Sequence, residues 1–257
     1  MIFLNLGGSL ITDKTKPLTP HIEIIQRLAA EIAAAWQADK ELSLLIGHGS
    51  GSFGHFAASQ TGTHQGAFTP QDWSGFITVA DAARQLHQLV MRELINADLP
   101  AISFPPSTML LTRDGEIVTY HSGPITQALQ HGLMPVVHGD VAFDRSQGSA
   151  IVSTEQVFSA LLSEFHPERV LLAGLEDGVL DSSGRTLPEI TRSDLADLDF
   201  GDARGADVTG GMQAKVELAL TWAESPNNAD VMIFSATAPG QLKHVLLGGT
   251  AGTRIRS

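Results

Sequence analysis

The sequence contains no cysteine, and this absence excludes two classes of protein at once. Without thiols the chain can form neither a disulfide framework nor a thiolate metal site, so we expect it to work in the reducing cytoplasm. It also lacks any apolar run long enough to span a membrane. The opening residues, MIFLNLGGSL, have neither the positive charges nor the cleavage site of a signal peptide, and they are typical of a buried first strand.

Positive charge is also scarce. Lysine and arginine number 16 against 28 aspartates and glutamates, and the formal net charge is −12. Binding to nucleic acid depends on a broad basic surface, so this composition argues against it. An acidic protein can still bind a phosphorylated small molecule where a few cations are placed locally. Lysine occurs at only five positions, which makes their places informative: Lys14, Lys16, Lys40, Lys215 and Lys243.

What is present is a globular balance, with 43% hydrophobic and 17% charged residues in a chain of 257 residues. Short apolar runs typical of buried strands alternate with segments of helical periodicity. We expect strands at 1–6, 42–46, 100–104, 133–140, 169–174 and 230–236, and helices at 75–97, 122–131, 154–165 and 212–223. We also expect a loop-rich stretch with short strands at 175–210 and an edge strand at 252–256.

Two local signals refine this pattern. Thr19 and Pro20 are typical of a helix N-cap and first turn, and we expect a helix from there through Ala35. The segment MLLTRDGEIVTY, residues 109–120, predicts a hairpin with a tight turn at Asp114 and Gly115. The alternation of strands and helices indicates an α/β three-layer sandwich with a mostly parallel central sheet and a β-hairpin insertion.

Glycine clusters follow the predicted strands, at the sheet edge where ligands bind in such folds. They lie at 7–8, 47–54, 139, 174–178 and 210–211. The richest, GHGSGSFGHFAAS, contains G-x-G-x-x-G from Gly49 to Gly54, and amides followed by a helix N-terminus attract an anion. By itself this match is equally a tight turn. A dinucleotide-binding fold needs an acidic residue closing the next strand, whereas Asp72 lies in a segment that we interpret as a loop.

Two of the scarce lysines lie beside glycine turns. Lys14 follows the Gly7-Gly8 turn, and Lys215 lies near the start of a predicted helix that follows the Gly210-Gly211 turn. One lysine near a helix start is common, but the coincidence of two suggests phosphate binding. The P-loop, G-x-S-x-G, H-E-x-x-H and protein-kinase motifs are all missing from the sequence.

Four stretches, in order, resemble the amino-acid-kinase superfamily and, within it, the isopentenyl phosphate kinases. They are LGGSLITDK, HGSGSFGH, MPVVHGDV with AIVSTEQ, and DVTGGMQAKVE, and the resemblance covers essentially the whole chain. The histidine that closes GSFGH is the specific part, because the glutamate-type kinases lack it. Fosfomycin kinases share much of the pattern. The resemblance implies a homodimer of one domain, 1–257, with an acceptor-binding lobe of about 1–165 and a nucleotide-binding lobe of about 166–257.

The resemblance also implies a reaction, in which MgATP and isopentenyl phosphate give ADP and isopentenyl diphosphate by direct in-line transfer. Such chemistry needs two anions to be positioned and their charge to be spread, with no covalent intermediate. We expect no dedicated protein site for a metal, since Mg²⁺ would arrive with ATP. The nucleotide would contact Gly7, Gly8, Ser9, Gly174, Asp177, Gly178, Gly210, Gly211 and Lys215.

On the acceptor side, the resemblance makes His55 the hydrogen-bond partner of the acceptor phosphate and Lys14 a contact of the transferring oxygens. The phosphate cradle and its rim would consist of Gly49, Ser50, Gly51, Gly54, Gly139 and Asp140. A pocket for a short isoprenoid tail, whose length is selected sterically, would be lined by Phe76, Val79, Ala83 and Ile151. We interpret His48 as structural.

Two positions depart from the family pattern. Asn5, in the catalytic set with His55, Lys14 and Lys215, stands where the family usually has lysine, and Glu155 stands where it usually has aspartate. Asparagine can donate a hydrogen bond but brings no charge, and such a loss could raise the barrier by roughly a few kcal/mol. Two alternatives therefore remain open: a fosfomycin-type phosphonate kinase, and a nucleotide-binding regulatory relative with weak or no transfer.

Overall fold

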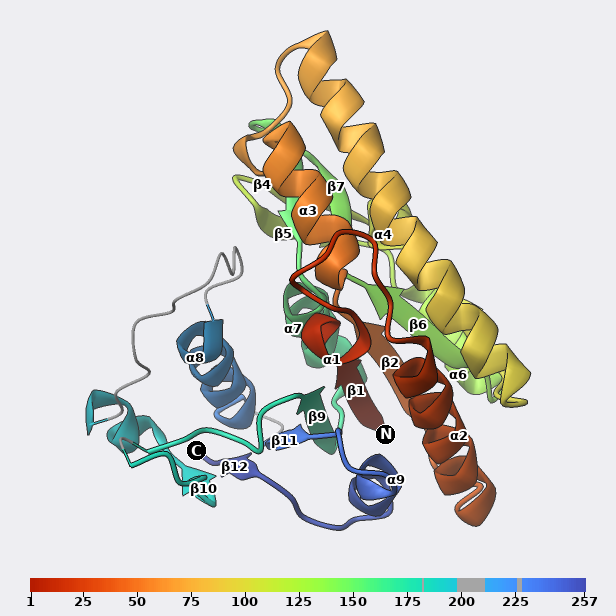
Figure 1. The fold of residues 1–257 in the computed structure, drawn as a ribbon, viewed down its shortest axis with the longest axis vertical. Helices are drawn as coiled ribbons and strands as arrows, with labels where there is room; N and C mark the ends of the chain where they lie inside the picture. Colours follow the sequence, from red (N-terminus) through yellow and green to blue (C-terminus); the bar gives the residue numbers. More distant parts are fainter. Residues whose placement is uncertain (182, 198–210, 226–227) are drawn as a thin grey trace.

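The computed structural model of the protein describes residues 1–181, 183–197, 211–225 and 228–257 (Figure 1). The strands are β1 (Ile2–Leu6), β2 (Leu44–His48), β3 (Ala101–Ser103), β4 (Leu110–Arg113), β5 (Glu116–Tyr120), β6 (Met134–His138), β7 (Asp140–Asp144), β8 (Gly148–Val152), β9 (Arg169–Gly174), β10 (Glu189–Ile190), β11 (Asp230–Ser235) and β12 (Thr253–Ile255). The helices are α1 (Gly8–Ile11), α2 (Ile22–Ala38), α3 (Gly51–Thr61), α4 (Pro70–Asn96), α5 (Pro106–Met109), α6 (Gly123–Gln130), α7 (Thr154–Phe165), α8 (Gly211–Ala223) and α9 (Gln241–Leu246), with 3₁₀ turns η1 (Thr63–Gln65) and η2 (Arg192–Asp197).

The described residues form one large sheet with the strand order β10-β12-β11-β9-β1-β2-β6-β3. Strand β1 lies between β2 and β9 and pairs with both in parallel. The departure from parallel pairing is β12, which runs antiparallel to β11. The mostly parallel sheet is therefore confirmed, and the carboxyl ends of its central strands meet at one edge.

Two hydrophobic cores, one on each face of this sheet, make three layers. Side chains alternate along β1, so Leu4 packs in the core beneath α1, α2, α3, α4 and α9. Phe3 packs on Phe158 of α7, in the core that also includes residues of α6 and α8. Figure 1 shows α4, the longest helix, running past the large sheet and alongside β7. None of the helices in the described ranges combines the length and the hydropathy of a membrane span.

The start of the second helix was predicted wrongly. Helix α2 begins at Ile22 with His21 as its N-cap, not at Thr19 and Pro20. Pro20 instead forms an isolated antiparallel bridge with Thr12, and the carbonyl of Thr19 accepts a hydrogen bond from the Asp13 amide. These contacts close a loop after α1, and the sequence pattern did not predict the short helix α1.

Helix α4 begins earlier than the predicted 75–97, because its N-terminus is a capping box. The Thr69 side chain accepts from the Asp72 amide, and Asp72 in turn accepts from the Thr69 amide at 2.8 Å. Interpreting Asp72 as a loop residue was therefore wrong. Pro70 occupies the first turn, where its missing N–H costs nothing.

The expected hairpin insertion is larger than the sequence predicted. Strands β4 and β5 form the hairpin, but β7 and β8 extend it to a second sheet with the order β5-β4-β7-β8. The predicted strand at 133–140 therefore ends at His138, and β7 begins at Asp140. At the opposite end of the large sheet β12 is not the edge, since β10 lies outside it.

Candidate active site

Two glycine turns interlock at the carboxyl edge of the large sheet. Leu6 pairs with His48 across β1 and β2, so the turns that follow these two strands begin side by side. A methyl group on Gly8 would lie 2.7 Å from the amide nitrogen of Gly51, and one on Gly49 would lie 2.8 Å from that of Gly8. Only glycine allows backbones to approach so closely, and the convergence expected from the sequence is present.

The segment that carries Lys14 is attached to the start of α3. Thr12 accepts a hydrogen bond from the Ser52 amide at 2.9 Å through Oγ1 and donates to the Gly8 carbonyl at 2.7 Å. The Thr19 amide donates to Ser52 Oγ at 3.2 Å. Between these anchors the exposed Lys14 lies on a turn, two residues after Thr12, which contacts Gly8 and Gly51.

Helix α3 carries His55 one turn beyond this convergence. The helix begins at Gly51, and Ser50 provides no side-chain cap for its first amides. Residues four apart share a face of a helix, so the half-buried His55 lies on the same side as Gly51, which packs against Gly8 and Thr12. An imidazole and a helix N-terminus therefore meet where an anion can bind.

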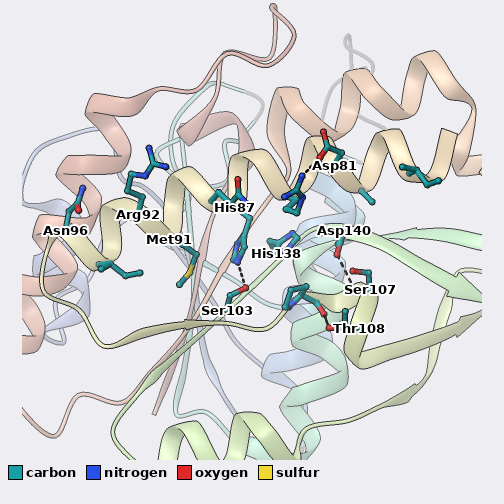
Figure 2. Close-up of a pocket in the computed structure, with 16 residues that line it drawn as sticks. Asp81, His87, Met91, Arg92, Asn96, Ser103, Ser107, Thr108, His138 and Asp140 are labelled. Carbon is teal, nitrogen blue, oxygen red and sulfur yellow. Dashed lines mark hydrogen bonds and ion pairs between the residues drawn. The ribbon is translucent and has the colours of Figure 1, made fainter. Parts of the chain in front are cut away.

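The third strand end at this edge brings Gly139 beside the loop. The Gly139 amide donates to the His48 carbonyl at 3.0 Å, and a methyl group on Gly139 would lie 3.4 Å from the Ser50 amide nitrogen. The carboxylate of Asp140 turns the other way, as Figure 2 shows, and accepts from the Ser107 amide at 3.3 Å. The structure thus unites Gly139 with the loop but directs Asp140 toward α5.

Asn5 lies on the opposite face of the sheet from His48 and contacts α7. Its side chain is 3% exposed, and Nδ2 donates to Glu155 Oε1 at 3.0 Å. The other amide atom, Oδ1, is buried without a hydrogen-bond partner among the described residues. Glu155 is in the first turn of α7, where Ser153 and Gln156 form a capping box that fixes the helix start.

The candidate nucleotide residues gather at the ends of β1 and β9. Gly7 donates to the Ala173 carbonyl at 2.8 Å, which places the first glycine turn beside Gly174. Gly178 has a φ of +137° and packs against Thr253 so closely that a methyl group would lie 2.5 Å from Thr253 Oγ1. Asp177 lines a cavity of about 360 Å³ that reaches Thr237 beyond β11.

The remaining candidates occupy three different settings. Ser9 is half-buried in α1, beside the interlocked turns, and Lys215 is half-buried near the start of α8. Gly211 is the first residue of α8, whereas Gly210 lies outside the described residues. Of the candidates for the tail pocket, Phe76 and Val79 belong to the core beneath α4, Ile151 packs against it, and Ala83 is fully buried. Phe76 also packs on Trp73 and Phe143.

Sequence reasoning missed a buried cluster of three histidines behind the glycine loop. His48 and His138 end neighbouring strands, and His87 reaches them from α4. Burial lowers the pKa of His48 to about 3, and it also lowers the pKa values of His87 and His138. The signal in the sequence was the repeated dipeptide His-Gly after two predicted strands.

Comparison with known proteins identifies the family and the fold. Residues 1–235 match the amino acid kinase family. The isopentenyl phosphate kinase of Methanothermobacter thermautotrophicus is 33% identical over 269 aligned positions, which cover 99% of this chain and 98% of that one. The corresponding enzyme of Haloferax volcanii is 33% identical over 261 positions, covering 100% and 98%. A solved isopentenyl phosphate kinase structure superposes with a TM-score of 0.83 at 30% identity, covering 99% of both chains.

Proposed function

The chain belongs to the amino acid kinase family, and from this premise we propose that it phosphorylates isopentenyl phosphate to isopentenyl diphosphate with ATP. One observation carries the proposal: the interlocked glycine turns at Gly8 and Gly49–Gly51 lead into the first turn of α3, and His55 lies one turn beyond Gly51 on this helix. Backbone amides of two strand ends and one imidazole there offer hydrogen bonds to two phosphates at once.

In this proposal the donor and acceptor approach from the two sides of β1. The β- and γ-phosphates of ATP lie on the first glycine turn and near Lys215, on residues Gly7, Gly8, Ser9, Gly210 and Gly211. The nucleoside extends along the end of β9, at Gly174, Asp177 and Gly178. Catalysis then rests on alignment and on spreading the charge of the transferring group, with no covalent intermediate on the protein.

The acceptor phosphate occupies the opposite side, against the loop of Gly49, Ser50, Gly51 and Gly54 and next to Gly139. The Gly49 and Gly54 amides donate to the carbonyls of Leu6 and Ser50, so the amides of Ser50 and Gly51 hold the phosphate. His55 donates a hydrogen bond to it, and Lys14 contacts the transferring oxygens. The five-carbon tail points into the core between α4 and β8, toward Phe76 and Ile151, where apolar side chains select its length by shape. Asp140 acts only at the rim, because its carboxylate faces Ser107.

Mg²⁺ enters as part of the substrate MgATP. The described residues hold no group of three or more histidine, aspartate or glutamate side chains that could bind a metal ion. We propose that the ion is held mainly by phosphate oxygens and water, with at most one or two carboxylates. Glu155 is the carboxylate nearest to Asn5 and lies on the sheet face opposite His48.

We further propose that the protein acts in the cytoplasm, where ATP is abundant, as a homodimer. The edge strand β3 and helix α4 border a groove of about 1010 Å³. Apolar side chains are exposed there, with Ile77 66% and Ile95 55% accessible, and Ile102 on β3 39% accessible. A second copy would cover this apolar surface and the unpaired strand edge. Light scattering of the wild type and of Ile95→Glu tests this, with a dimer expected only for the wild type.

An acceptor screen with ATP and Mg²⁺, followed by ADP release, tests the function. We expect the highest kcat/KM with isopentenyl phosphate, and lower values with fosfomycin and N-acetylglutamate. ATP binding without ADP release on any phosphate monoester would instead support a regulatory relative, which the uncharged Asn5 favours. Preferential turnover of fosfomycin would support the phosphonate kinase.

A further inference from the structure

The strands β2 and β6 end in the same way. His48 and His138 pair in register, each is followed by glycine, and their rings stack at 5.5 Å. In each case the ring nitrogen Nδ1 lies 3.0 Å from the carbonyl oxygen of the following glycine, Gly49 or Gly139. A carbonyl oxygen can only accept a hydrogen bond, so Nδ1 carries the proton in both rings.

The proton position in His48 determines which ring nitrogen of His87 donates a hydrogen bond and which accepts one. With the proton on Nδ1, the neutral His48 ring has an unprotonated Nε2, which lies 2.9 Å from His87 Nδ1. His87 must therefore donate from Nδ1, and its own Nε2 must accept from the Ser103 hydroxyl at 2.6 Å. Figure 2 shows His87 reaching from α4 to Ser103 on the edge strand, beside His138. The direction of donation is thus Ser103 to His87, His87 to His48, and His48 to Gly49.

The end point of this chain is the phosphate loop of the proposed function. In a trans peptide the C=O and N–H groups point in opposite directions, and the described residues contain no cis bond. A bond that holds the Gly49 carbonyl toward His48 therefore turns the Ser50 N–H away from His48. The Ser50 nitrogen lies next to Gly139, on the side assigned to the acceptor.

Burial keeps the histidine rings of this hydrogen-bond chain neutral. His48 is fully buried, and His87 and His138 are 5% and 2% exposed. Desolvation lowers the pKa values of all three rings, and the Asp140 carboxylate partly opposes this effect at His138. Each ring thus stays neutral near pH 7, the state in which one nitrogen donates and the other accepts.

We propose that His48, His87 and Ser103 are positioning residues: their one-way hydrogen-bond chain fixes the Gly49–Ser50 peptide so that the Ser50 amide faces the acceptor phosphate. This inference rests on the proposed function for the identity of the acceptor. It adds residues from α4 and β3 that touch neither substrate, and it gives His48 a role beyond packing.

Ring tautomers provide the first test, and they need no substrate. In wild-type protein labelled with ¹⁵N in its histidine rings, we expect NMR at pH 7.5 to place the protons of His48 and His87 on Nδ1. This is the less populated tautomer of free histidine. In Ser103→Ala the His87 Nδ1 still donates to His48 Nε2, so we expect the same tautomers, while His87 Nε2 loses its donor. Protons on Nε2 of His48 or His87 in the wild type would overturn the proposal.

Two substitutions at His48 form a matched pair. Asparagine places an amide nitrogen near the Nδ1 position and can still donate to Gly49, whereas glutamine places it near Nε2 and cannot. We expect the KM for isopentenyl phosphate to stay within about threefold in His48→Asn and to rise about tenfold in His48→Gln, the cost of one hydrogen bond. The KM for ATP should change in neither.

Two further variants test the end of the hydrogen-bond chain that is farthest from Gly49. The control is Ser163→Ala, on the exposed face of α7. His87→Leu should raise the acceptor KM about tenfold and Ser103→Ala by less, with the ATP KM unchanged. Equal defects in His48→Asn and His48→Gln, or equal changes in both KM values, would overturn the proposal. If the wild type fails to phosphorylate isopentenyl phosphate, the proposed function fails, while the tautomers still decide whether the chain exists.

Discussion

The side-chain amide of Asn5 donates to the carboxylate of Glu155 across 3.0 Å and joins the central strand β1 to the first turn of α7. Its orientation is fixed, because turning the amide would bring Oδ1 against the carboxylate. Oδ1 is left buried without a partner among the described residues, which costs about 1–3 kcal/mol in a folded protein. An ammonium, which carries no acceptor oxygen, would leave no such orphan atom next to Glu155.

Asn5→Lys should therefore raise kcat. A lysine here would pair with Glu155 and place positive charge at the end of β1, close to the Gly7-Gly8 turn. Since one well-placed donor is worth about 10²–10³ in rate, we expect an increase of at least about tenfold in steady-state ADP release. Asn5→Leu, which removes the hydrogen bond and adds no charge, is the control. An unchanged kcat in the lysine variant would mean that another cation, such as Lys14, already supplies this charge.

Removing the imidazole of His55 should affect one substrate only. His55 lies one turn beyond Gly51 on α3, on the side that we propose for the acceptor, so His55→Ala should lower kcat/KM for isopentenyl phosphate by about 10²-fold or more. The KM for ATP should not change. His64→Ala, in the exposed 3₁₀ turn that follows α3, provides the matched control. A parallel loss of ATP affinity would move His55 away from the acceptor phosphate.

The interlocked glycines predict a steric effect. Gly8→Ala places a methyl group 2.7 Å from the Gly51 nitrogen, where backbone and not a flexible side chain must move. We expect a destabilisation of about 1–3 kcal/mol, as for other overpacked sites, together with loss of turnover. Gly123→Ala is the comparison, because the nearest atom to its methyl group lies at 3.7 Å. Urea unfolding of both variants distinguishes them, and equal stability would contradict the close approach.

The parts of the fold that follow from local pattern could be predicted from the sequence. The apolar runs of β1, β2, β9 and β11 are buried on both faces, and their carboxyl ends meet at one edge by the general rule for parallel sheets. Strands β7 and β8 could not be predicted, because their pattern is interrupted by polar residues whose partners are distant. Asp144, for example, accepts hydrogen bonds from the Gly115 and Ser146 amides and so joins two turns.

The same distinction holds for the candidate site. Glycine turns and His55 lie within single motifs, so the sequence alone was enough to predict that they group together. The contact between Asn5 and Glu155 joins residues 150 positions apart, and His87 meets His48 across 39 positions. Such pairs depend on how α4 and α7 pack on the sheet, which periodicity does not specify.

The three buried histidines predict an unusual pH dependence of stability. Above about pH 6.5, the ordinary pKa of histidine, the rings are neutral in both the folded and the unfolded chain, and stability is at its full value. Below it the unfolded chain binds protons that the folded protein resists, because burial holds the pKa of His48 at about 3 and lowers those of His87 and His138. Stability is therefore lost as the pH falls.

Each such ring contributes a slope of about 1.4 kcal/mol per pH unit below the ordinary histidine pKa of about 6.5, so His48 and His87 together would remove about 3 kcal/mol between pH 7.5 and 5.5, and the lowered pKa of His138 acts in the same direction. Urea unfolding at these two values and at pH 6.5 measures this slope, and His87→Leu should reduce it. Carboxylates contribute little here, since their ordinary pKa values lie near 4. A free energy of unfolding that stays constant from pH 7.5 to 5.5 would mean that the histidine cluster accepts protons without opening, and that its rings are not held neutral by burial.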